Sequence, residues 1–494
     1  MLLLFFLMSS AVALVVHEPP PPQPRTRTVP VEGWSSIRLH QFDASNTDTF
    51  QMRYYYNSEF AATNNVVIFV GGEWAISPGW VAGGLAHELA EALEAGLFYT
   101  EHRYYGQTRP TNDTRSTELR FLTVDQALAD LAQFIQYIRS DRFDGGRFSG
   151  GKVSLVGCSY AGSMATWMRL GYPHLVTAAF SDSGPLLAQE DFPEYLEVIT
   201  DALLSQGSEE CVASVAEAIE KAVKMLADER SAQVSEMFNT CSPINGSNPL
   251  DVSTFFWFGI TETFAYLVQY ATPGDIPAAC DVITDIRESD PLRRLATWVR
   301  SQPWTQPCIE SRYERQVAYH TNTSYDSVMR LWTYQTCVEF GWYQTTSSDR
   351  QPFLSTVPLE YFHRMCKDFF GDYFDEGVLR RGIERSNLLW GGRRHQPDGV
   401  IAVAGGLDPW MPMGPLPEHG TPLAPVHLVP GVSHCRAIRS TGDSETEELE
   451  RAKRAVLRGM QDLVEGRPPY SGSTKTTTMT IVVITALLTL IVVD

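Results

Sequence analysis

Residues 151–173, GKVSLVGCSYAGSMATWMRLGYP, combine a strand, a sharp turn and a helix without a break. An apolar run ends at Gly157, Ser159 follows it, and Gly162 lies where a helical stretch begins. This spacing departs from G-x-S-x-G by one extra residue, but small neighbours still allow a turn tight enough to project a serine. The pattern predicts a nucleophilic Ser159 at a helix N-terminus, and an ordinary glycine-rich loop with an exposed serine is the alternative.

Strands and helices alternate around this turn. NNVVIFVGGEW (64–74) predicts a buried strand that ends in two glycines, and TVDQALADLAQFIQYIRSD (123–141) predicts a helix. Strand character returns at 399–410 and 425–435, after a long stretch with a helical pattern. The alternation predicts an α/β protein with a mostly parallel sheet and helices on both faces.

The chain of 494 residues is long enough for one large domain that carries an insertion. We expect a signal peptide (1–13), a proline-rich linker (14–33), the first part of the core (34–186), a helical cap insertion (187–389), the second part of the core (390–468) and a C-terminal attachment signal (469–494). The first 16 residues are mostly apolar and contain Ala11-Val12-Ala13, which is typical of a signal-peptide cleavage site. The alternative is a membrane anchor, but the run is short for one and contains two serines.

The last 24 residues, SGSTKTTTMTIVVITALLTLIVVD, have an unusual order. They begin with small residues, continue through a threonine-rich spacer and end in an apolar tail with no basic residue behind it. This order is typical of a glycosylphosphatidylinositol (GPI) attachment signal, with Ser471 as the lipid attachment residue. A transmembrane helix is the alternative, but the tail from Ile481 to Val493 is shorter than the ~20 apolar residues that a span needs.

Secretion would place the eight cysteines in an oxidising compartment, so their even number predicts disulfides. Three Asn-x-Ser/Thr sequons, at Asn112, Asn245 and Asn322, predict glycosylation on the same route. The expected location is therefore the secretory pathway, ending at the cell surface or in a lysosome-like compartment. The net charge of −19 argues against a nucleic-acid partner, because nucleic-acid binding needs a basic surface.

A catalytic serine needs a base, and the base needs a carboxylate that orients it. Asp408 follows the strand VIAVAGG and His434 follows the strand VHLVPG, each on the type of loop where such partners lie. Both come after Ser159, in the order serine, acid, histidine. His102 and Asp182 are rivals, but His102 precedes the serine and Asp182 lies only 23 residues beyond it. We therefore expect Asp408 and His434 to act with the serine.

Two backbone N–H groups are expected to form an oxyanion hole. One belongs to Tyr160, directly after the serine, and the other to Gly72 in the loop FVGGEW. Glu73 lies at the mouth of this loop. We interpret it as a carboxylate that meets a substrate amine or orders the loops, and a solvated surface acid is the alternative.

The motifs of this chain follow one another in the order found in one family of peptidases. They are TFQMRYYYN, VGGEW, EHRYYGQTRP, GCSYAGSMATWMRLGYPHLV, LWTYQTCVEFGWYQT, GGLDPW and PGVSHC. In these motifs, from about residue 40 to 466, the chain resembles the serine carboxypeptidase family S28. This family includes lysosomal Pro-X carboxypeptidase, dipeptidyl peptidase II and thymus-specific serine protease, and the SYAGS and SHC forms are most similar to the thymus-specific branch.

The resemblance implies an α/β-hydrolase core, with the helical insertion capping the site. It implies that Ser159 is the nucleophile, Asp408 the orienting acid and His434 the base, and we expect no cofactor and no metal ion. It also implies three disulfides, Cys211–Cys280, Cys241–Cys308 and Cys337–Cys366. Cys158 and Cys435 are left over, each beside a member of this triad. A bond between them and two buried free thiols are both open, the free thiols being the simpler interpretation.

Members of the family typically cleave beside proline, whose ring sits in an apolar pocket. The resemblance places Trp410 in this pocket, with Tyr160 and Trp342 along its wall. Ser163 stands where the proline-selective members have methionine, so it is a candidate determinant of the residue that is cleaved.

The sequence thus predicts a serine exopeptidase that hydrolyses peptides through an acyl-enzyme and is held at the membrane by its C-terminal anchor. Whether it removes C-terminal residues or N-terminal dipeptides depends on which charged terminus the cap contacts. Members of the family are often dimeric, so a homodimer is a further expectation. An esterase or lipase is the alternative enzyme, since the same triad hydrolyses esters. A surface binding protein on an inactive hydrolase scaffold is the alternative outside enzymes.

Overall fold

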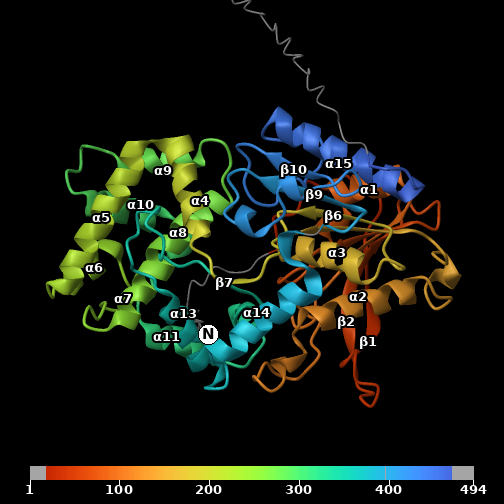
Figure 1. The fold of residues 1–494 in the computed structure, drawn as a ribbon, viewed down its shortest axis with the longest axis horizontal. Helices are drawn as coiled ribbons and strands as arrows, with labels where there is room; N and C mark the ends of the chain where they lie inside the picture. The colour runs from red at the N-terminus through yellow and green to blue at the C-terminus, as the bar shows by residue number, and fades with distance from the viewer. Residues whose placement is uncertain (1–17, 395, 470–494) are drawn as a thin grey trace, which may run out of the picture.

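A computed structural model describes residues 18–394 and 396–469 (Figure 1). An eight-stranded sheet runs through the core in the order β1-β2-β4-β3-β5-β6-β9-β10. Its strands are β1 (Val31–Arg38), β2 (Thr49–Asn57), β3 (Val66–Val70), β4 (Gly96–Thr100), β5 (Val153–Cys158), β6 (Ala178–Asp182), β9 (Val400–Gly405) and β10 (Val426–Val429). β2 pairs antiparallel with β1 and β4, and all other neighbours pair parallel. The prediction of a mostly parallel sheet is confirmed, and β1 begins inside the segment expected to be a linker (14–33).

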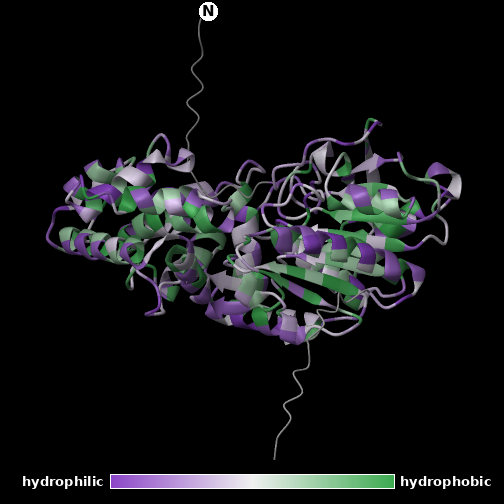
Figure 2. Ribbon diagram, turned by 90° about the horizontal axis from the view of Figure 1, so that it is seen from above, coloured by the Kyte–Doolittle hydropathy of each residue, from purple (hydrophilic) through white to green (hydrophobic). Residues whose placement is uncertain are grey.

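Four helices cover the two faces of this sheet. They are α1 (Leu85–Ala92), α2 (Val124–Ile138), α3 (Tyr160–Gly171) and α15 (Glu447–Glu465). α1 and α15 pack together on one face, and α2 and α3 lie on the other (Figure 1). Because both faces are covered, β3, β4, β5, β6 and β9 are buried at every position. Figure 2 shows the strands of the core as largely hydrophobic.

A helical cap is inserted between β6 and β9 and lies beside the sheet (Figure 1). Its helices are α4 (Glu194–Ala202), α5 (Glu209–Ala227), α6 (Ser231–Phe238), α7 (Pro249–Phe256), α8 (Glu262–Gln269), α9 (Asp275–Ile283), α10 (Pro291–Ser301), α11 (Tyr313–His320), α12 (Val328–Gln335), α13 (Leu359–Phe370) and α14 (Glu376–Trp390). A two-stranded parallel ladder of β7 (Gln189–Asp191) and β8 (Gly341–Tyr343) joins distant parts of the insertion. The architecture is that of the expected α/β-hydrolase core with a helical cap.

Four disulfides cross-link the described residues. Three of them join the cysteines that the resemblance pairs, Cys211–Cys280, Cys241–Cys308 and Cys337–Cys366. All three lie within the cap. The fourth joins Cys158 to Cys435, the two cysteines whose state the sequence left open, and it lies in the core. Disulfides in these numbers are typical of proteins from oxidising compartments.

Several predicted processing sites fall outside the structure or on its surface. The predicted signal peptide (1–13) and the predicted attachment residue Ser471 lie outside the described residues. Within residues 18–394 and 396–469, no helix is both long and apolar enough to cross a bilayer. The sequon asparagines Asn112, Asn245 and Asn322 are all exposed, as glycan attachment requires.

Candidate active site

Ser159 lies at the sharp turn between β5 and α3. Its backbone has φ of 56° and ψ of −134°, a conformation that a residue with a side chain adopts only where its surroundings enforce it. A Cβ at Gly157 would lie 2.2 Å from the Ala161 carbonyl oxygen, and one at Gly162 would lie 2.9 Å from the Ser181 hydroxyl oxygen. The two glycines therefore let strand and helix approach closely enough to project the serine.

His434 is held by a carboxylate on the neighbouring loop. Asp408 follows β9 and is fully buried, and His434 Nδ1 donates to its two oxygens, each at 2.9 Å. The Trp410 backbone N–H donates to Asp408 Oδ1 at 2.9 Å and so fixes the carboxylate in turn. Burial opposes a charge on His434, but the attraction of Asp408 and the hydrogen bond outweigh it and raise the pKa of the imidazole. Nε2 is left as the basic nitrogen.

The second nitrogen of His434 shares a cavity with Ser159. Both residues line a cavity of about 550 Å³, whose walls come from the core and the cap. His434 Nε2 is buried and has no hydrogen-bond partner among the described residues. An imidazole nitrogen in this state can accept the proton of a serine hydroxyl, and such contacts tighten when substrate binds.

A disulfide ties the serine turn to the histidine loop. Cys158 directly precedes Ser159, Cys435 directly follows His434, and their Cα atoms lie 5.6 Å apart. Both cysteines line the cavity. The structure therefore replaces the simpler interpretation, two buried thiols, by a covalent link between the loops that carry Ser159 and His434.

Asp182, the rival acid, holds these same loops rather than the imidazole. Its backbone carbonyl accepts a hydrogen bond from the Ser159 N–H at 2.9 Å. Its carboxylate accepts from the N–H groups of Ala437 and Ile438, at 2.7 and 3.0 Å, just beyond His434. Burial raises the pKa of the Asp182 carboxyl to about 6, against the lowering influence of these N–H groups and of the imidazole. Asp182 is thus a positioning residue.

His102, the rival base, lies in a separate buried network. Its Nδ1 donates to the Arg103 carbonyl at 2.8 Å, and its Nε2 accepts from the Tyr160 hydroxyl at 3.1 Å. Gln335 also donates to the Tyr160 hydroxyl, at 3.1 Å. Burial lowers the pKa of His102 to about 4, so the imidazole is neutral and serves to fix the ring of Tyr160.

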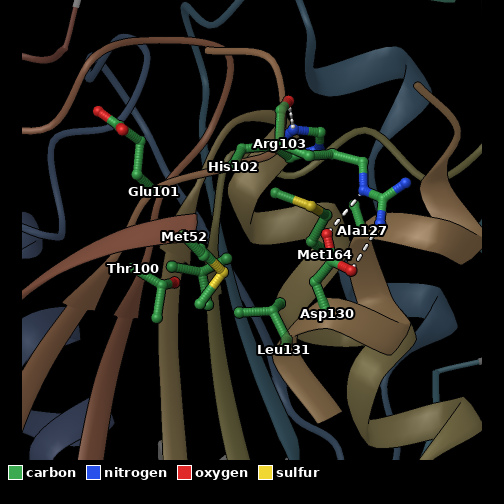
Figure 3. A pocket seen from close by; sticks show the side chains of 11 residues that line it. Met52, Thr100, Glu101, His102, Arg103, Ala127, Asp130, Leu131 and Met164 are labelled. Atoms are coloured by element: carbon green, nitrogen blue, oxygen red, sulfur yellow. Dashed lines mark hydrogen bonds and ion pairs between the residues drawn. The ribbon is translucent and has the colours of Figure 1, made fainter. Parts of the chain in front are cut away.

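A small cavity beside His102 is structural in character. Figure 3 shows Arg103 turned toward Asp130, with hydrogen bonds of 2.6 Å from Nε and Nη2 to the two carboxylate oxygens. This buried bidentate pair anchors the loop after β4 onto α2. Ser159, Asp408 and His434 do not line this cavity.

Trp342 and Trp410 form an aromatic wall of the large cavity. Their ring centroids lie 5.5 Å apart and their planes are close to perpendicular. The Trp342 indole N–H donates to the Leu187 carbonyl at 2.7 Å, and the Trp410 indole N–H donates to Gln269 Oε1 at 3.2 Å. Both indole nitrogens are satisfied, so the wall presents apolar ring surface to the cavity. The substrate-binding role that the resemblance implies for these residues stays a prediction.

Ser163 lies on α3 behind the wall of the large cavity. Its fully buried hydroxyl donates to the Pro185 carbonyl at 2.6 Å. Pro185 lines the cavity, whereas Ser163 does not. Ser163 therefore lies one layer behind the cavity wall, and its role in selecting the residue that is cleaved stays a prediction.

Glu73 lies in the loop after β3 and lines the large cavity. Its side chain belongs to a residue only 8% exposed, and its Oε2 has no hydrogen-bond partner among the described residues. Burial raises its pKa to about 7, although His434 pulls the value down. The alternative of a solvated surface acid is wrong, because the side chain is buried in the wall of the cavity.

Comparison with known proteins places this site in a family. The chain matches the family model of serine carboxypeptidase S28 over residues 37–456. The chain belongs to this family. The thymus-specific serine protease of Mus musculus is 30% identical over 455 residues, covering 88% of this chain and 87% of that protein. The Homo sapiens protein of the same name is 28% identical over 456 residues, and its alignment covers 89% and 87% of the two chains.

The resemblance inferred from the motifs is therefore confirmed, and this S28 peptidase is a serine exopeptidase. The lysosomal Pro-X carboxypeptidase of Mus musculus is 22% identical over 416 residues, covering 80% of this chain and 82% of that protein. A solved proline iminopeptidase of Mycobacterium smegmatis has a TM-score of 0.36 at 11% identity, covering 87% of this chain and 99% of that one. This structural similarity is too low to carry an argument, so the fold class rests on the strand order and pairing.

The N-terminal segment of the S28 peptidase forms part of the cavity wall, which sequence reasoning missed. Glu18, Pro19 and Pro20 line the large cavity. The Ser77 N–H donates to the Glu18 carboxylate at 2.9 Å, and the Trp80 indole N–H donates to the Pro19 carbonyl at 3.0 Å. The proline-rich composition favoured a segment without regular structure, and residues 18–30 form no helix or strand. The composition does not tell where that segment lies.

Helix α8 of the cap of the S28 peptidase reaches the loops that carry Trp410 and His434. The Gln269 carbonyl accepts from the His434 N–H at 3.2 Å and from the Ser433 hydroxyl at 2.7 Å. Its side-chain Oε1 accepts from the Trp410 indole and, at 2.6 Å, from the Tyr195 hydroxyl. No local motif marks Gln269, which lies inside the helical insertion. Cap and core therefore build the site together.

Proposed function

We propose that Ser159, His434 and Asp408 are the catalytic triad of this serine exopeptidase. The observation that carries this proposal is the setting of His434. Asp408 fixes its Nδ1, while Nε2 lies without a partner in the cavity that Ser159 also lines. This is the relation of acid, base and nucleophile that acyl transfer requires.

The chemistry follows from these positions. As Ser159 Oγ attacks the peptide carbonyl carbon, its proton passes to His434 Nε2. The imidazolium then gives this proton to the leaving amine as the C–N bond breaks, which leaves an acyl ester on the serine. Water attacks the ester with the same base, and Asp408 stays ionised throughout to stabilise the imidazolium.

The N–H groups of Tyr160 and Gly72 are the proposed oxyanion donors. Tyr160 is the first residue of α3, so its N–H has no partner within the helix and carries the positive end of the helix dipole. Gly72 lies just after β3, the strand that pairs with β5. A Cβ at Gly72 would lie 2.6 Å from the Trp74 ring, so the bare backbone is needed here.

Of the two termini of a peptide substrate, the N-terminus is the better supported site of attack, with removal of N-terminal dipeptides as the activity. Glu73 Oε2 is buried in the cavity of Ser159 without a hydrogen-bond partner among the described residues, and a free N-terminal ammonium is a group that would satisfy it. Binding a cation also favours the ionised carboxylate and lowers its pKa.

A carboxypeptidase is the second candidate, and one observation favours it. Arg436 and Arg439, on the loop after His434, also line the cavity. Arg436 is paired with Glu445, whereas Arg439 makes no hydrogen bond or ion pair with a described residue. A C-terminal carboxylate on the leaving-group side would find a cation there.

Peptide pairs that differ in one blocked terminus decide between the two. We expect acetylation of the N-terminus to lower kcat/KM at least tenfold, and amidation of the C-terminus to change it little. Glu73→Gln should remove the effect of acetylation, whereas Glu91→Gln, an exposed acid on α1, should not. Dependence on the free C-terminus alone would establish the carboxypeptidase instead.

Short acyl esters, tested beside these peptides, address the esterase alternative. A peptidase should turn over its preferred peptide amide with a higher kcat/KM than a set of short acyl esters. Peptide turnover no better than that of a generic esterase would contradict the peptidase assignment. Ser159→Ala serves as the blank for both substrate classes.

We also propose the secretory route and a GPI anchor at Ser471 for the mature chain. Four disulfides and three exposed sequon asparagines support the route, and the anchor rests on the C-terminal sequence alone. Phosphatidylinositol-specific phospholipase C should release the protein from intact cells. Retention after this treatment, with release by detergent, would indicate a transmembrane helix. A homodimer stays a prediction.

A further inference from the structure

Glu262 is a second carboxyl in the cavity whose charge nothing in the protein balances. It is the first residue of α8, is 7% exposed and lines the same cavity as Ser159. Its backbone N–H donates to the Trp257 carbonyl, but its carboxyl makes no hydrogen bond or ion pair with any residue that the structure describes. Burial alone raises its pKa well above the usual range, so no nearby cation offsets the loss of water. Within the described residues, nothing stabilises the ionised form of this carboxyl.

Helix geometry places Glu262 at a definite depth. Glu262, Tyr266 and Gln269 are spaced i, i+4 and i+7 along α8 and all line the cavity, so one face of the helix forms its wall. Gln269, at the far end, contacts His434 and Trp410. Seven residues of α-helix span about 10 Å, which separates the two ends of this wall. A group bound at Trp410 therefore reaches Glu262 only through a long side chain.

The surroundings of Glu262 suit a cation with an apolar stem. Trp257, Phe258 and Tyr266 also line the cavity, on Glu262's own helix and the turn before it. Aromatic faces hold the methylene stem of a long basic side chain and attract its charge. Tyr195 connects this region to the triad: its ring lies 5.5 Å from that of Trp410, and burial, Asp408 and Glu262 all raise its pKa.

We propose that Glu262 recognises the cationic side chain of a lysine or arginine in the acyl part of the substrate, the part that stays on Ser159 after the bond breaks. The side chain passes the Trp410 wall and ends at Glu262, where it forms a buried ion pair. This proposal rests on the proposed function, because it takes Ser159 as the nucleophile. It makes the cavity selective for basic peptides and separates this role from that of Glu73, which faces the backbone terminus.

The test compares peptides that differ only in charge at one position. Peptides with lysine, arginine, norleucine or Nε-acetyl-lysine are placed in turn at each position before the cleaved bond, and at the position after it. For the intact enzyme we expect kcat/KM with lysine or arginine to exceed that with norleucine at least tenfold, at one position before the bond. Acetyl-lysine should behave as norleucine does.

The variant Glu262→Gln should lower the ratio of lysine to norleucine turnover at least tenfold. Glu217→Gln, an exposed acid on α5 of the same cap, is the matched control and should keep that ratio. Labelling by a fluorophosphonate shows that a variant has a folded site with a reactive serine. The ratio of lysine to norleucine turnover is measured only on variants that are labelled. If Glu262→Gln does not fold, the acetyl-lysine comparison on the intact enzyme tests the proposal by itself.

Equal turnover of lysine and norleucine at every position before the bond would overturn the proposal, as would a lysine preference that Glu262→Gln leaves intact. A lysine preference confined to the position after the bond would also overturn it. These failures differ from failure of the proposed function, in which the intact enzyme neither labels with fluorophosphonate nor cleaves any of the peptides.

Discussion

The turn between β5 and α3 and the cavity face of α8 serve the same site but are encoded differently. At the turn, Ser159 and both glycines that shape it lie within six consecutive residues. On α8, Glu262 and Gln269 lie in a helix of ordinary sequence and reach the site because the whole cap is folded over it. The turn that presents Ser159 is therefore encoded locally, whereas the cavity face of α8 depends on contacts between distant parts of the chain.

Asp408→Asn should produce the largest loss, because it keeps the shape of the core site and removes the charge that orients His434. We expect kcat to fall about 10³–10⁴-fold with little change in KM. Steady-state kinetics on the preferred peptide measures this, with Asp398→Asn, an exposed acid just before β9, as the control. A loss of less than tenfold would show that Asp408 does not orient the base.

Gly157→Ala tests whether the turn before α3 depends on the absence of a side chain at position 157. The added Cβ would lie 2.2 Å from the backbone oxygen of Ala161, which cannot move without breaking the turn. We expect either no folded protein or a loss of several kcal/mol in the free energy of unfolding. Gly171→Ala, in the last position of α3, meets only the Trp390 ring at 3.7 Å and should be nearly neutral. Similar thermal unfolding of the two variants would contradict the steric account.

Much of the core could be predicted from the sequence because its signals are short. The apolar run before Ser159 predicts a strand and the turn that follows it. Asp408 and His434 likewise follow short runs that predict later strands. The bond between Cys158 and Cys435 could not be predicted, since 277 residues separate the two cysteines. It forms because β5 and the loop after β10 come together in the folded sheet.

The cap side of the site was the part that local patterns missed. Helical periodicity predicts that α8 is a helix, but it does not tell which buried face lines a cavity and which meets another helix. Glu262 has no motif around it, and Glu18 was hidden in a proline-rich segment that reads as a linker. The family motif singled out Ser163, but it does not tell that Ser163 lies behind the cavity wall and that Pro185 lines the cavity in front of it.

Removing disulfides one at a time sharpens the comparison between core and cap. Cys158→Ser with Cys435→Ser unties the serine turn from the histidine loop, and we expect kcat to fall about tenfold while KM stays within twofold. Cys241→Ser with Cys308→Ser removes a cap disulfide, which should lower thermal stability and leave kcat unchanged. Asp182 continues to hold both loops in the first variant, so the loss is partial. Equal effects of the two variants on kcat would contradict a positioning role for the core disulfide.

The smallest effect concerns pH and the loop after β3. The pKa of Glu73 is raised to about 7 by burial, so the carboxyl loses its charge as the pH falls through this value. KM for a peptide with a free N-terminus should therefore rise below pH 7, by severalfold at pH 6. His434 also loses its basic form as the pH falls, and it does so for every substrate. The ratio to an N-acetylated peptide therefore isolates the contribution of Glu73. A ratio that stays constant with pH, or that keeps its slope in Glu73→Gln, would contradict binding of an ammonium there.

The most direct test of the central claim is to locate a fluorophosphonate adduct by mass spectrometry after proteolysis. The account predicts one adduct, on Ser159, whose rate of formation falls at least a hundredfold in His434→Ala and in Asp408→Asn. Both variants should keep the thermal unfolding of a folded protein, which separates slow chemistry from lost structure. An adduct on another residue, or labelling of Ser159 at the same rate in both variants, would contradict the proposed triad.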